Sequence, residues 1–242
     1  MKIVVQKFGG SSVADLDKLH KVCNHIIMEK NKGNEVVVVV SAQGDTTDLL
    51  LEQEKEITKK ANKKHHDLLV SVGEQITVAK LAMCLEELGF NATTFLGWQV
   101  PIITNSNYGD ASIINIKTKN IKKELNKGNI VIVAGFQGVD KNNNITTLGR
   151  GGSDTTAVYL SCALNAKCEL YKDVDGIYNG DPNKDKNVKK YKQLSYDQMQ
   201  ELVKNGAQVL HDKCITMAKK NSIQITVKST FKKNSLGTII HC

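Results

Sequence analysis

The chain has 242 residues, of which 40% are hydrophobic and 24% are charged. This composition excludes a disordered or collagen-like chain, and the length allows a substantial hydrophobic core in one or two domains. The formal net charge of +8 comes from 33 lysines and arginines against 25 acidic residues, and Arg150 is the only arginine in the sequence. Any function that requires a guanidinium group therefore depends on Arg150.

The basic residues do not indicate nucleic-acid binding. They are spread along the chain, and the five Phe, six Tyr and one Trp form no interleaved set on which bases could stack. The six cysteines contain no Cys-x-x-Cys pair and are interpreted as reduced packing residues. No signal-like segment and no apolar run of membrane-spanning length is found, so we expect a cytoplasmic protein with no nucleic-acid or membrane partner.

Strands and helices are predicted to alternate in the first half of the chain. Residues 3–8 are a predicted strand that ends at Gly9-Gly10, followed by a capped helix to about residue 32. Residues 35–41 form a β-branched run typical of a central parallel strand. Helices are predicted over residues 48–64 and 66–88. The second helix is expected to pack inward the face formed by Leu68, Leu69, Val72, Ile76, Ala79, Met83 and Leu88.

The second half continues the alternation. Helices are predicted over residues 118–126 and 153–164, and over 195–220 with a break at Gly206; residues 174–190 are a predicted polar loop. Strands are predicted at residues 93–96, 102–103, 130–134, 145–148, 168–171, 223–227 and 238–240. This order predicts an α/β fold, a three-layer α/β/α sandwich with a mainly parallel open sheet. No linker or repeat divides the chain, so we expect one domain of two lobes, residues 1–135 and 136–242.

Two glycine-rich loops lead into predicted helices. They are Lys7-Phe8-Gly9-Gly10-Ser11-Ser12 and Gly149-Arg150-Gly151-Gly152-Ser153-Asp154. Helix N-termini present backbone N–H groups and a positive dipole end to anions. One such loop alone is as often a tight turn, but two loops at one sheet edge can bind the same polyphosphate. Together they favour a nucleotide-dependent phosphoryl transfer.

Several motifs resemble those of aspartokinases, which belong to the amino acid kinase family. They are the opening Lys7-Phe8-Gly9-Gly10-Ser11-Ser12-Val13, residues 41–47, Val72-Gly73-Glu74, residues 149–154 and residues 173–178. The resemblance covers the whole chain and implies the amino acid kinase fold. It also implies phosphorylation of the L-aspartate β-carboxylate to 4-phospho-L-aspartate with ATP and Mg²⁺, the first step toward lysine, threonine, methionine and diaminopimelate.

The resemblance assigns roles to individual residues. Lys7 is expected at the phosphate oxygens as a catalytic residue, and Asp154 is expected to orient it. The expected aspartate contacts are Ser41, Thr47, Glu74, Phe136, Arg150 and Ser153. The expected ATP contacts are Lys7, Phe8, Gly9, Gly10, Gly152, Ser153, Lys172, Asp173, Tyr178, Asn183, Gln208 and Val209. No residue is expected to ligate a metal.

The acceptor chemistry explains why no catalytic histidine is expected. An aspartate carboxylate, with a pKa of ~3.9, is already charged at neutral pH and needs no general base. His65 and His66 are therefore interpreted as an exposed helix start, and His211 as a packing or capping residue.

The chain departs from the aspartokinase pattern beside the nucleotide. Lys172 stands where threonine is usual, Asn183 where arginine is usual, and Gln208 where a lysine is expected near the phosphates. Lys172 and Lys213 are candidates for replacement charges. These departures leave two alternatives open: an amino acid kinase with a different acidic acceptor, and a catalytically weak regulatory or binding homologue.

The end of the sequence also bears on regulation. The chain stops at Cys242, where the kinase domain is expected to close, so no regulatory domain of the ACT type is expected. A natural short form would be indifferent to lysine and threonine; the alternative is a truncated or split chain. A homodimer is expected only by analogy with the family.

Overall fold

The computed structural model describes residues 2–180, 188–207, 209–232 and 235–242. In these residues, eight strands form a large sheet, and their bounds are β1 Ile3–Phe8, β2 Glu35–Val40, β3 Ala92–Phe95, β6 Ile130–Ala134, β9 Lys167–Lys172, β10 Gln193–Ser195, β11 Ile225–Ser229 and β12 Thr238–His241. Their order across the sheet is β10-β12-β11-β9-β1-β2-β6-β3. The pairs from β11 to β3 are parallel, and only the β11–β12 pair is antiparallel.

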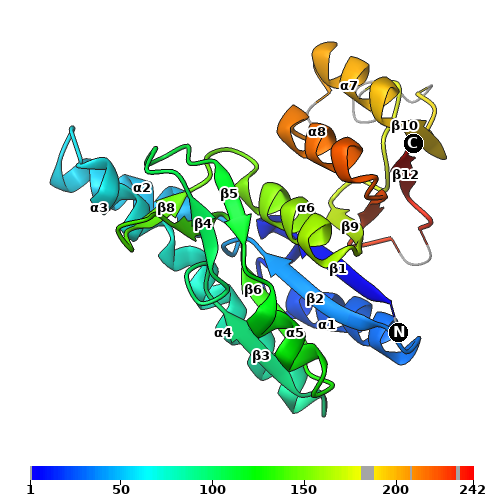
Figure 1. Cartoon of the computed structure of the whole chain (residues 1–242), viewed down its shortest axis with the longest axis horizontal. Helices are drawn as coiled ribbons and strands as arrows, with labels where there is room; N and C mark the ends of the chain where they lie inside the picture. Colours follow the sequence, from blue (N-terminus) through cyan, green and yellow to red (C-terminus); the bar gives the residue numbers. More distant parts are fainter. Residues whose placement is uncertain (1, 181–187, 208, 233–234) are drawn as a thin grey trace.

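Helices cover both faces of this sheet. Their bounds are η1 Gly10–Ser12, α1 Leu16–Asn31, α2 Thr46–Ile57, α3 Lys63–Val70, α4 Val72–Glu87, α5 Lys119–Leu125, α6 Gly152–Leu164, α7 Tyr196–Lys204 and α8 Asp212–Asn221. Helices α1 and α4 pack on one face, and α5, α6, α7 and α8 pack on the other (Figure 1). The predicted three-layer α/β/α sandwich with a mainly parallel sheet is therefore confirmed.

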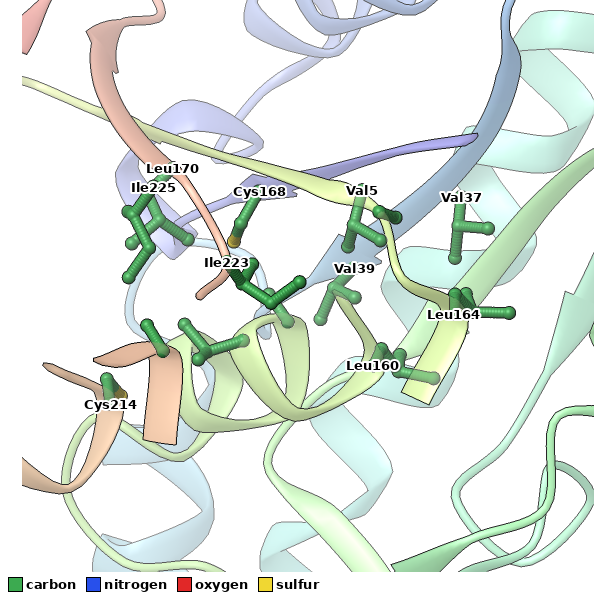
Figure 2. Close-up of a cluster of buried hydrophobic side chains, with 14 of the residues drawn as sticks. Val5, Val37, Val39, Leu160, Leu164, Cys168, Leu170, Cys214, Ile223 and Ile225 are labelled. Atoms are coloured by element: carbon green, nitrogen blue, oxygen red, sulfur yellow. The ribbon is translucent and has the colours of Figure 1, made fainter. Parts of the chain in front are cut away.

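The valine run of β2 lies at the centre of the core. Its five valines are completely buried, because the strand is covered by helices on both faces. Val37 and Val39 point with Val5 of β1 toward Leu160 and Leu164 of α6, as Figure 2 shows. The neighbouring valines face α1 and α4. This packing fixes β1 in the middle of the sheet, where Lys7 stands in register with Val39 of β2 and Leu170 of β9.

The prediction for residues 66–88 was right about the helix and wrong about its buried face. Leu68, Val72, Ile76 and Met83 are exposed, whereas Val78, Leu81, Ala82, Cys84 and Leu85 pack on the sheet. The helix is apolar around most of its circumference, so periodicity alone could not select the inner face. The selected face is the one that also carries Glu74.

Helices α3 and α4 follow each other directly, and Lys63–Glu87 is long and apolar enough, by length and composition, to cross a membrane. No apolar run of this length was expected from the sequence. In the fold, 56% of its most apolar stretch is buried, which is typical of a core helix in a globular domain.

A second, smaller sheet was not predicted. It consists of β4 Ile102–Thr104, β5 Ile113–Ile116, β7 Gln137–Val139 and β8 Ile145–Thr147, in the order β5-β4-β7-β8. With α2 and α3 it forms the end of the molecule opposite α7, α8 and the C-terminus (Figure 1). The strands β4 and β8 were predicted, as residues 102–103 and 145–148, but β5 and β7 were not. All four have only three or four residues, too few for a reliable periodic pattern.

Candidate active site

A cavity of about 610 Å³ lies where the carboxyl ends of β1 and β2 meet the N-termini of α4 and α6. This is the position at which open α/β sheets bind ligands. Among the residues expected from the sequence, those that line it are Lys7, Gly10, Ser41, Thr47, Glu74, Phe136, Arg150, Gly152, Ser153 and Asp154. The two glycine loops, which are about 140 residues apart in the sequence, therefore face one cavity.

Asp154 is held between two lysines at the bottom of this cavity. Lys7 Nζ lies 2.8 Å from Oδ1 of Asp154, and Lys172 Nζ lies 2.7 Å from Oδ2. Lys7 is the penultimate residue of β1 and Lys172 is the last residue of the adjacent parallel strand β9, so both side chains start near the same edge of the sheet. Lys172, which stands where aspartokinases usually have threonine, thus brings a second ammonium group beside Lys7.

The charge of Asp154 is set by these two contacts. Burial of this carboxyl favours its neutral form, but attraction by Lys7 and Lys172 outweighs burial and lowers the pKa of Asp154 to about 2. Asp154 is therefore ionised at neutral pH, and the group of three charges carries a net positive charge. Such a group suits an anionic ligand.

The loop before α6 is shaped by Gly151. Its φ of +71° lies in the left-handed region, and a Cβ there would stand 2.0 Å from Cδ2 of His211. His211 itself is half-buried and precedes α8 without a side-chain capping bond, so it acts as a packing residue. The first turn of α6 leaves the N–H of Ser153 without an intrahelical acceptor. This close turn directs that donor and the positive helix end toward the cavity.

The loop after β1 is equally close-packed. A Cβ on Gly10 would stand 2.7 Å from the carbonyl oxygen of Ala42, and the N–H of Gly44 donates to the Gly10 carbonyl at 3.2 Å. Glycine at this position therefore lets the loop after β1 lie directly against the loop after β2 at the cavity. Ser41, directly after β2, lines the cavity and donates its N–H to the carbonyl of Phe8.

Glu74 is a second buried carboxyl in the cavity wall. It lies in the first turn of α4 and is 3% exposed. Its Oε1 accepts a hydrogen bond from the N–H of Ala42 at 3.0 Å, whereas Oε2 has no partner among the described residues. Burial outweighs this hydrogen bond and the nearby Lys7, and raises the pKa of Glu74 to about 7. A buried acceptor atom without a partner is uncommon in proteins, so Glu74 Oε2 is a candidate contact for a donor group of a ligand.

Arg150 and Phe136 complete the acceptor end of the cavity. Arg150 is exposed, and no carboxylate of the described residues forms an ion pair with it. Phe136 has a φ of +68°, a conformation that costs about 1–3 kcal/mol in a non-glycine residue and often occurs at functional sites. Its N–H donates to Thr156 Oγ1 at 3.2 Å and its carbonyl accepts from Leu148, which hold the strained backbone in place.

Other expected ATP contacts lie away from this cavity. The Phe8 side chain is fully buried and stacks on Tyr171, so only its backbone can reach a ligand at the loop. Gly9, Lys172, Asp173, Tyr178 and Val209 do not line the cavity; Lys172 contacts it only through Asp154, and the Tyr178 hydroxyl donates to Asp175. Asn183 and Gln208 lie outside the described residues.

Several cavity residues were not expected from the sequence. His66 is half-buried, pairs through Nδ1 with Oε2 of Glu54 at 2.7 Å and lines the cavity, so it is not part of an exposed helix start. Thr147 and Gly109 also line it. They come from β8 and from the loop after β4, which belong to the unpredicted small sheet, and no local motif marks them.

A larger hollow of about 810 Å³ lies on the other face of β9, β11 and β12, beside α1. Its acidic residues are already neutralised, since Glu169 pairs with Lys228 and Glu29 pairs with Lys32. The described residues that line it include no glycine loop at a helix N-terminus and no buried acceptor atom without a partner, such as Glu74 Oε2. We therefore assign the active site to the smaller cavity.

The fold and the cavity define an α/β protein in which two glycine loops and a net positive group of side chains face one cavity. The sequence profile of the amino acid kinase family matches residues 2–229. The chain therefore belongs to the amino acid kinase family.

Relatives within this family are aspartokinases. The chain is 48% identical over 241 residues to the aspartokinase of Bacillus sp. (strain MGA3), covering 99% of this chain and 58% of that protein. It superposes on aspartokinase III of E. coli in complex with aspartate and ADP with a TM-score of 0.89 and 27% identity, covering 99% of this chain and 64% of that one. The aspartate kinase of Synechocystis gives a TM-score of 0.88 and 36% identity, with 99% and 40% covered. The chain thus spans about 58% of the Bacillus relative.

Proposed function

We propose that this chain transfers the γ-phosphoryl group of ATP to the β-carboxylate of L-aspartate and so forms 4-phospho-L-aspartate. The observation that carries the proposal is a pair of buried carboxyls in one cavity with different partners. Asp154 lies between two lysines, whereas Glu74 has one oxygen without a partner among the described residues. The similarity to aspartokinases over 99% of the chain supports aspartate as the acceptor.

In this proposal the amino acid is bound by complementary charges. Glu74 Oε2 accepts from the α-ammonium group, and Arg150 holds a carboxylate through two parallel N–H donors, a geometry that lysine does not provide. Ser41, Thr47 and Ser153 offer hydroxyls at the same wall, and the ring of Phe136 closes it. Residues 1–135 then supply the ammonium end of the acceptor site together with Lys7 and the first glycine loop, and residues 136–242 supply Arg150 and the remaining nucleotide contacts.

The phosphate end is formed by the two lysines and the glycine loops. Lys7 and Lys172 neutralise oxygens of the transferring group, while Asp154 fixes both ammonium groups in place. Backbone N–H groups of Gly9, Gly10 and Ser153 are proposed to donate to the phosphates. Gly152, whose N–H donates to the Gly149 carbonyl at 3.0 Å, is proposed as a close backbone contact. The remaining proposed nucleotide contacts are Phe8, Asp173, Tyr178, Asn183, Gln208 and Val209.

Magnesium is proposed to arrive with ATP. The described residues contain no cluster of three His, Cys, Asp or Glu side chains that fits a metal ion, and both oxygens of Asp154 are engaged by lysines. Mg²⁺ is commonly bound largely through substrate phosphates and water, with few protein ligands. We therefore assign no residue of this chain to the ion.

The chemical step needs no proton transfer. A β-carboxylate oxygen forms a bond to the γ-phosphorus, and the bond from that phosphorus to the β–γ bridging oxygen breaks, which releases ADP. Two anions must approach each other, so the lysines and oriented N–H groups supply the stabilisation that the reaction requires. The acceptor is already ionised, because its pKa of ~3.9 lies well below neutral pH.

Hydroxylamine trapping tests this function directly. Purified protein is incubated with ATP, Mg²⁺ and either aspartate, glutamate or N-acetylglutamate, and the acyl phosphate is trapped as a hydroxamate. We expect hydroxamate with aspartate only. Hydroxamate with another acceptor would assign a different amino acid kinase, and ATP binding without any hydroxamate would assign a weak or regulatory homologue.

We also propose a homodimer through the outer face of α3 and α4. Leu68, Val72, Ile76 and Met83 form an exposed apolar stripe on it. A second copy packed antiparallel would cover the stripe and bring Glu86 and Glu87 at one end near the lysines Lys63 and Lys64 at the other. Light scattering should give a dimer for the native chain and a monomer for Ile76→Glu/Met83→Glu, with Ile114→Glu, exposed on β5, as the control. A native monomer would refute this interface.

A cytoplasmic location is proposed from the thiols. All six cysteines are free, and Cys23, Cys84, Cys168 and Cys214 are buried packing residues. Thiols persist in a reducing compartment.

A further inference from the structure

Asp67 of α3 is a fully buried carboxylate that the proposed mechanism does not use. Its Oδ2 accepts hydrogen bonds from the N–H of Thr147 at 2.8 Å and from the N–H of Gly109 at 3.1 Å. Its Oδ1 accepts from the hydroxyl of Thr147 at 2.8 Å. No lysine or arginine of the described residues forms an ion pair with it. A buried charge satisfied only by backbone and hydroxyl donors requires those donors to be held in fixed positions.

The donors belong to two separate segments that both line the cavity. Thr147 is the last residue of β8, and Gly109 lies in the loop after β4. These segments are also joined to each other, since the N–H of Ala111 donates to the Thr147 carbonyl at 2.8 Å. The chain leaves this junction directly into Gly149 and Arg150. Asp67 therefore joins α3, the loop after β4 and the end of β8 directly before the segment that carries Arg150.

We propose that Asp67 is a positioning residue that fixes the Arg150 loop in the orientation needed to bind the acceptor. This inference rests on the proposed function in one respect, that Arg150 receives the acceptor carboxylate. The hydrogen bonds to Thr147 and Gly109 do the positioning, and the negative charge of Asp67 is needed only to make them strong. Loss of these bonds lets the loop move, and misplacement by about 1 Å can lower catalytic efficiency about 100-fold.

Two substitutions at Asp67 separate positioning from charge. Asp67→Ala removes all three acceptor contacts and leaves the N–H groups of Thr147 and Gly109 unpaired. Asp67→Asn has the same shape: its amide oxygen at the Oδ2 position accepts both N–H groups, and its NH₂ donates to the Thr147 hydroxyl, which can also accept. Positioning therefore predicts that Asp67→Asn retains most of the function that Asp67→Ala loses.

Asp140 provides a matched control in the same small sheet. It is also a buried carboxylate, it follows β7, and it accepts from the N–H groups of Asn142 and Asn144 and from the Ser106 and Tyr108 hydroxyls. None of these partners lines the cavity; Ser106 and Tyr108 lie in the loop that also carries Gly109, but no partner lies in the segment from Thr147 to Arg150. Asp140→Ala should lower stability as Asp67→Ala does, without moving the acceptor site.

Steady-state kinetics of the whole chain give the first readout. Asp67→Ala is expected to raise the KM for aspartate about 10- to 100-fold and the KM for ATP less than about 3-fold. Asp67→Asn should stay within about 5-fold of the native KM for aspartate, and Asp140→Ala should leave both constants unchanged. An equal rise of both KM values in Asp67→Ala, or equal losses in Asp67→Ala and Asp67→Asn, would overturn the positioning role.

The single arginine gives a second readout that does not depend on activity. A protease specific for arginine can cut this chain only after Arg150, and its rate under native conditions reports how often the loop opens. Asp67→Ala should be cut at least about 10-fold faster than the native chain, whereas Asp67→Asn and Asp140→Ala should be cut at nearly the native rate. Unchanged cleavage in Asp67→Ala refutes the inference, while absence of hydroxamate from the native chain refutes only the proposed function.

Discussion

The two buried carboxyls in the wall of the cavity are in contrasting electrostatic states. Asp154 contacts two lysines, and its pKa is lowered to about 2. Glu74 has one backbone donor and an unpartnered oxygen, and its pKa is raised to about 7. Burial favours the neutral form of both, so the difference comes from the cations that the protein does or does not supply.

This contrast indicates how the two ends of the cavity are used. At the phosphate end the protein provides its own counter-ions, and the site is charged before any ligand binds. At the acceptor end no cation of the described residues forms an ion pair with Glu74, and the ammonium group of the amino acid is proposed to provide the counter-ion. A ligand cation that completes a buried ion pair binds more strongly than at an exposed site, because little water screens the pair.

Removal of Lys7 from the phosphate end should cause the largest loss of activity. Lys7→Ala takes away the ammonium group on Oδ1 of Asp154, and kcat for hydroxamate formation is expected to fall at least about 1,000-fold, because stabilisation of the transferring group is lost. Lys2→Ala, at the opposite end of the same strand, is the control. Turnover of Lys7→Ala near the native value would contradict the assignment.

Lys172 tests whether the second cation of the phosphate end takes part. Lys172→Ala leaves Asp154 with Lys7 alone, and we expect kcat to fall about 10- to 100-fold. Lys167→Ala, an exposed lysine at the other end of β9, should have no effect. If both variants behave alike, Lys172 has only a structural contact with Asp154.

Glu74 tests the acceptor end through pH. Only the charged carboxylate pairs with an ammonium group, so the KM for aspartate of the native chain should rise as the pH falls below about 7, the pKa of Glu74. Glu74→Gln should raise this KM about 10- to 100-fold at pH 8, since a hydrogen bond to a charged group contributes about 1.5–3 kcal/mol. Its KM should then change little between pH 6 and pH 8. A pH dependence that persists in the variant would place the titrating group elsewhere.

Glu74→Gln should also stabilise the fold in the absence of ligand. The pKa of Glu74 is raised from 4.5 to about 7 by folding, so the free energy of unfolding should decrease as the pH rises from about 4.5 to 7 and then level off. The Glu74→Gln variant lacks this decrease. Its free energy of unfolding should therefore exceed that of the native chain by up to about 3 kcal/mol at pH 8, because each pKa unit corresponds to about 1.36 kcal/mol. Urea unfolding at pH 5 and pH 8 measures both values. A less stable variant at pH 8 would show that burial does not disfavour the Glu74 charge.

Much of the fold could be predicted from local sequence. The valine run of β2 predicts a buried parallel strand because β-branched residues favour a covered sheet. The capped helix predicted after Gly9-Gly10 is α1, in which the side chain of Asp15 accepts from the N–H of Lys18. The two glycine loops were also visible, because glycine is required where a Cβ would collide or φ is positive. In the described part of the chain, both loops lie where the alternation of strands and helices places them.

The sequence by itself determined the order of the longer strands and helices, the two loops and the residue types of the site, since these depend on periodicity and on the special conformations of glycine. Tertiary structure alone decided which face of α4 is buried, because the helix is apolar nearly all round. It also brought together Lys172 with Asp154 and Asp67 with Thr147. These pairs come from segments that meet only when the sheets assemble, and no local pattern encodes such contacts.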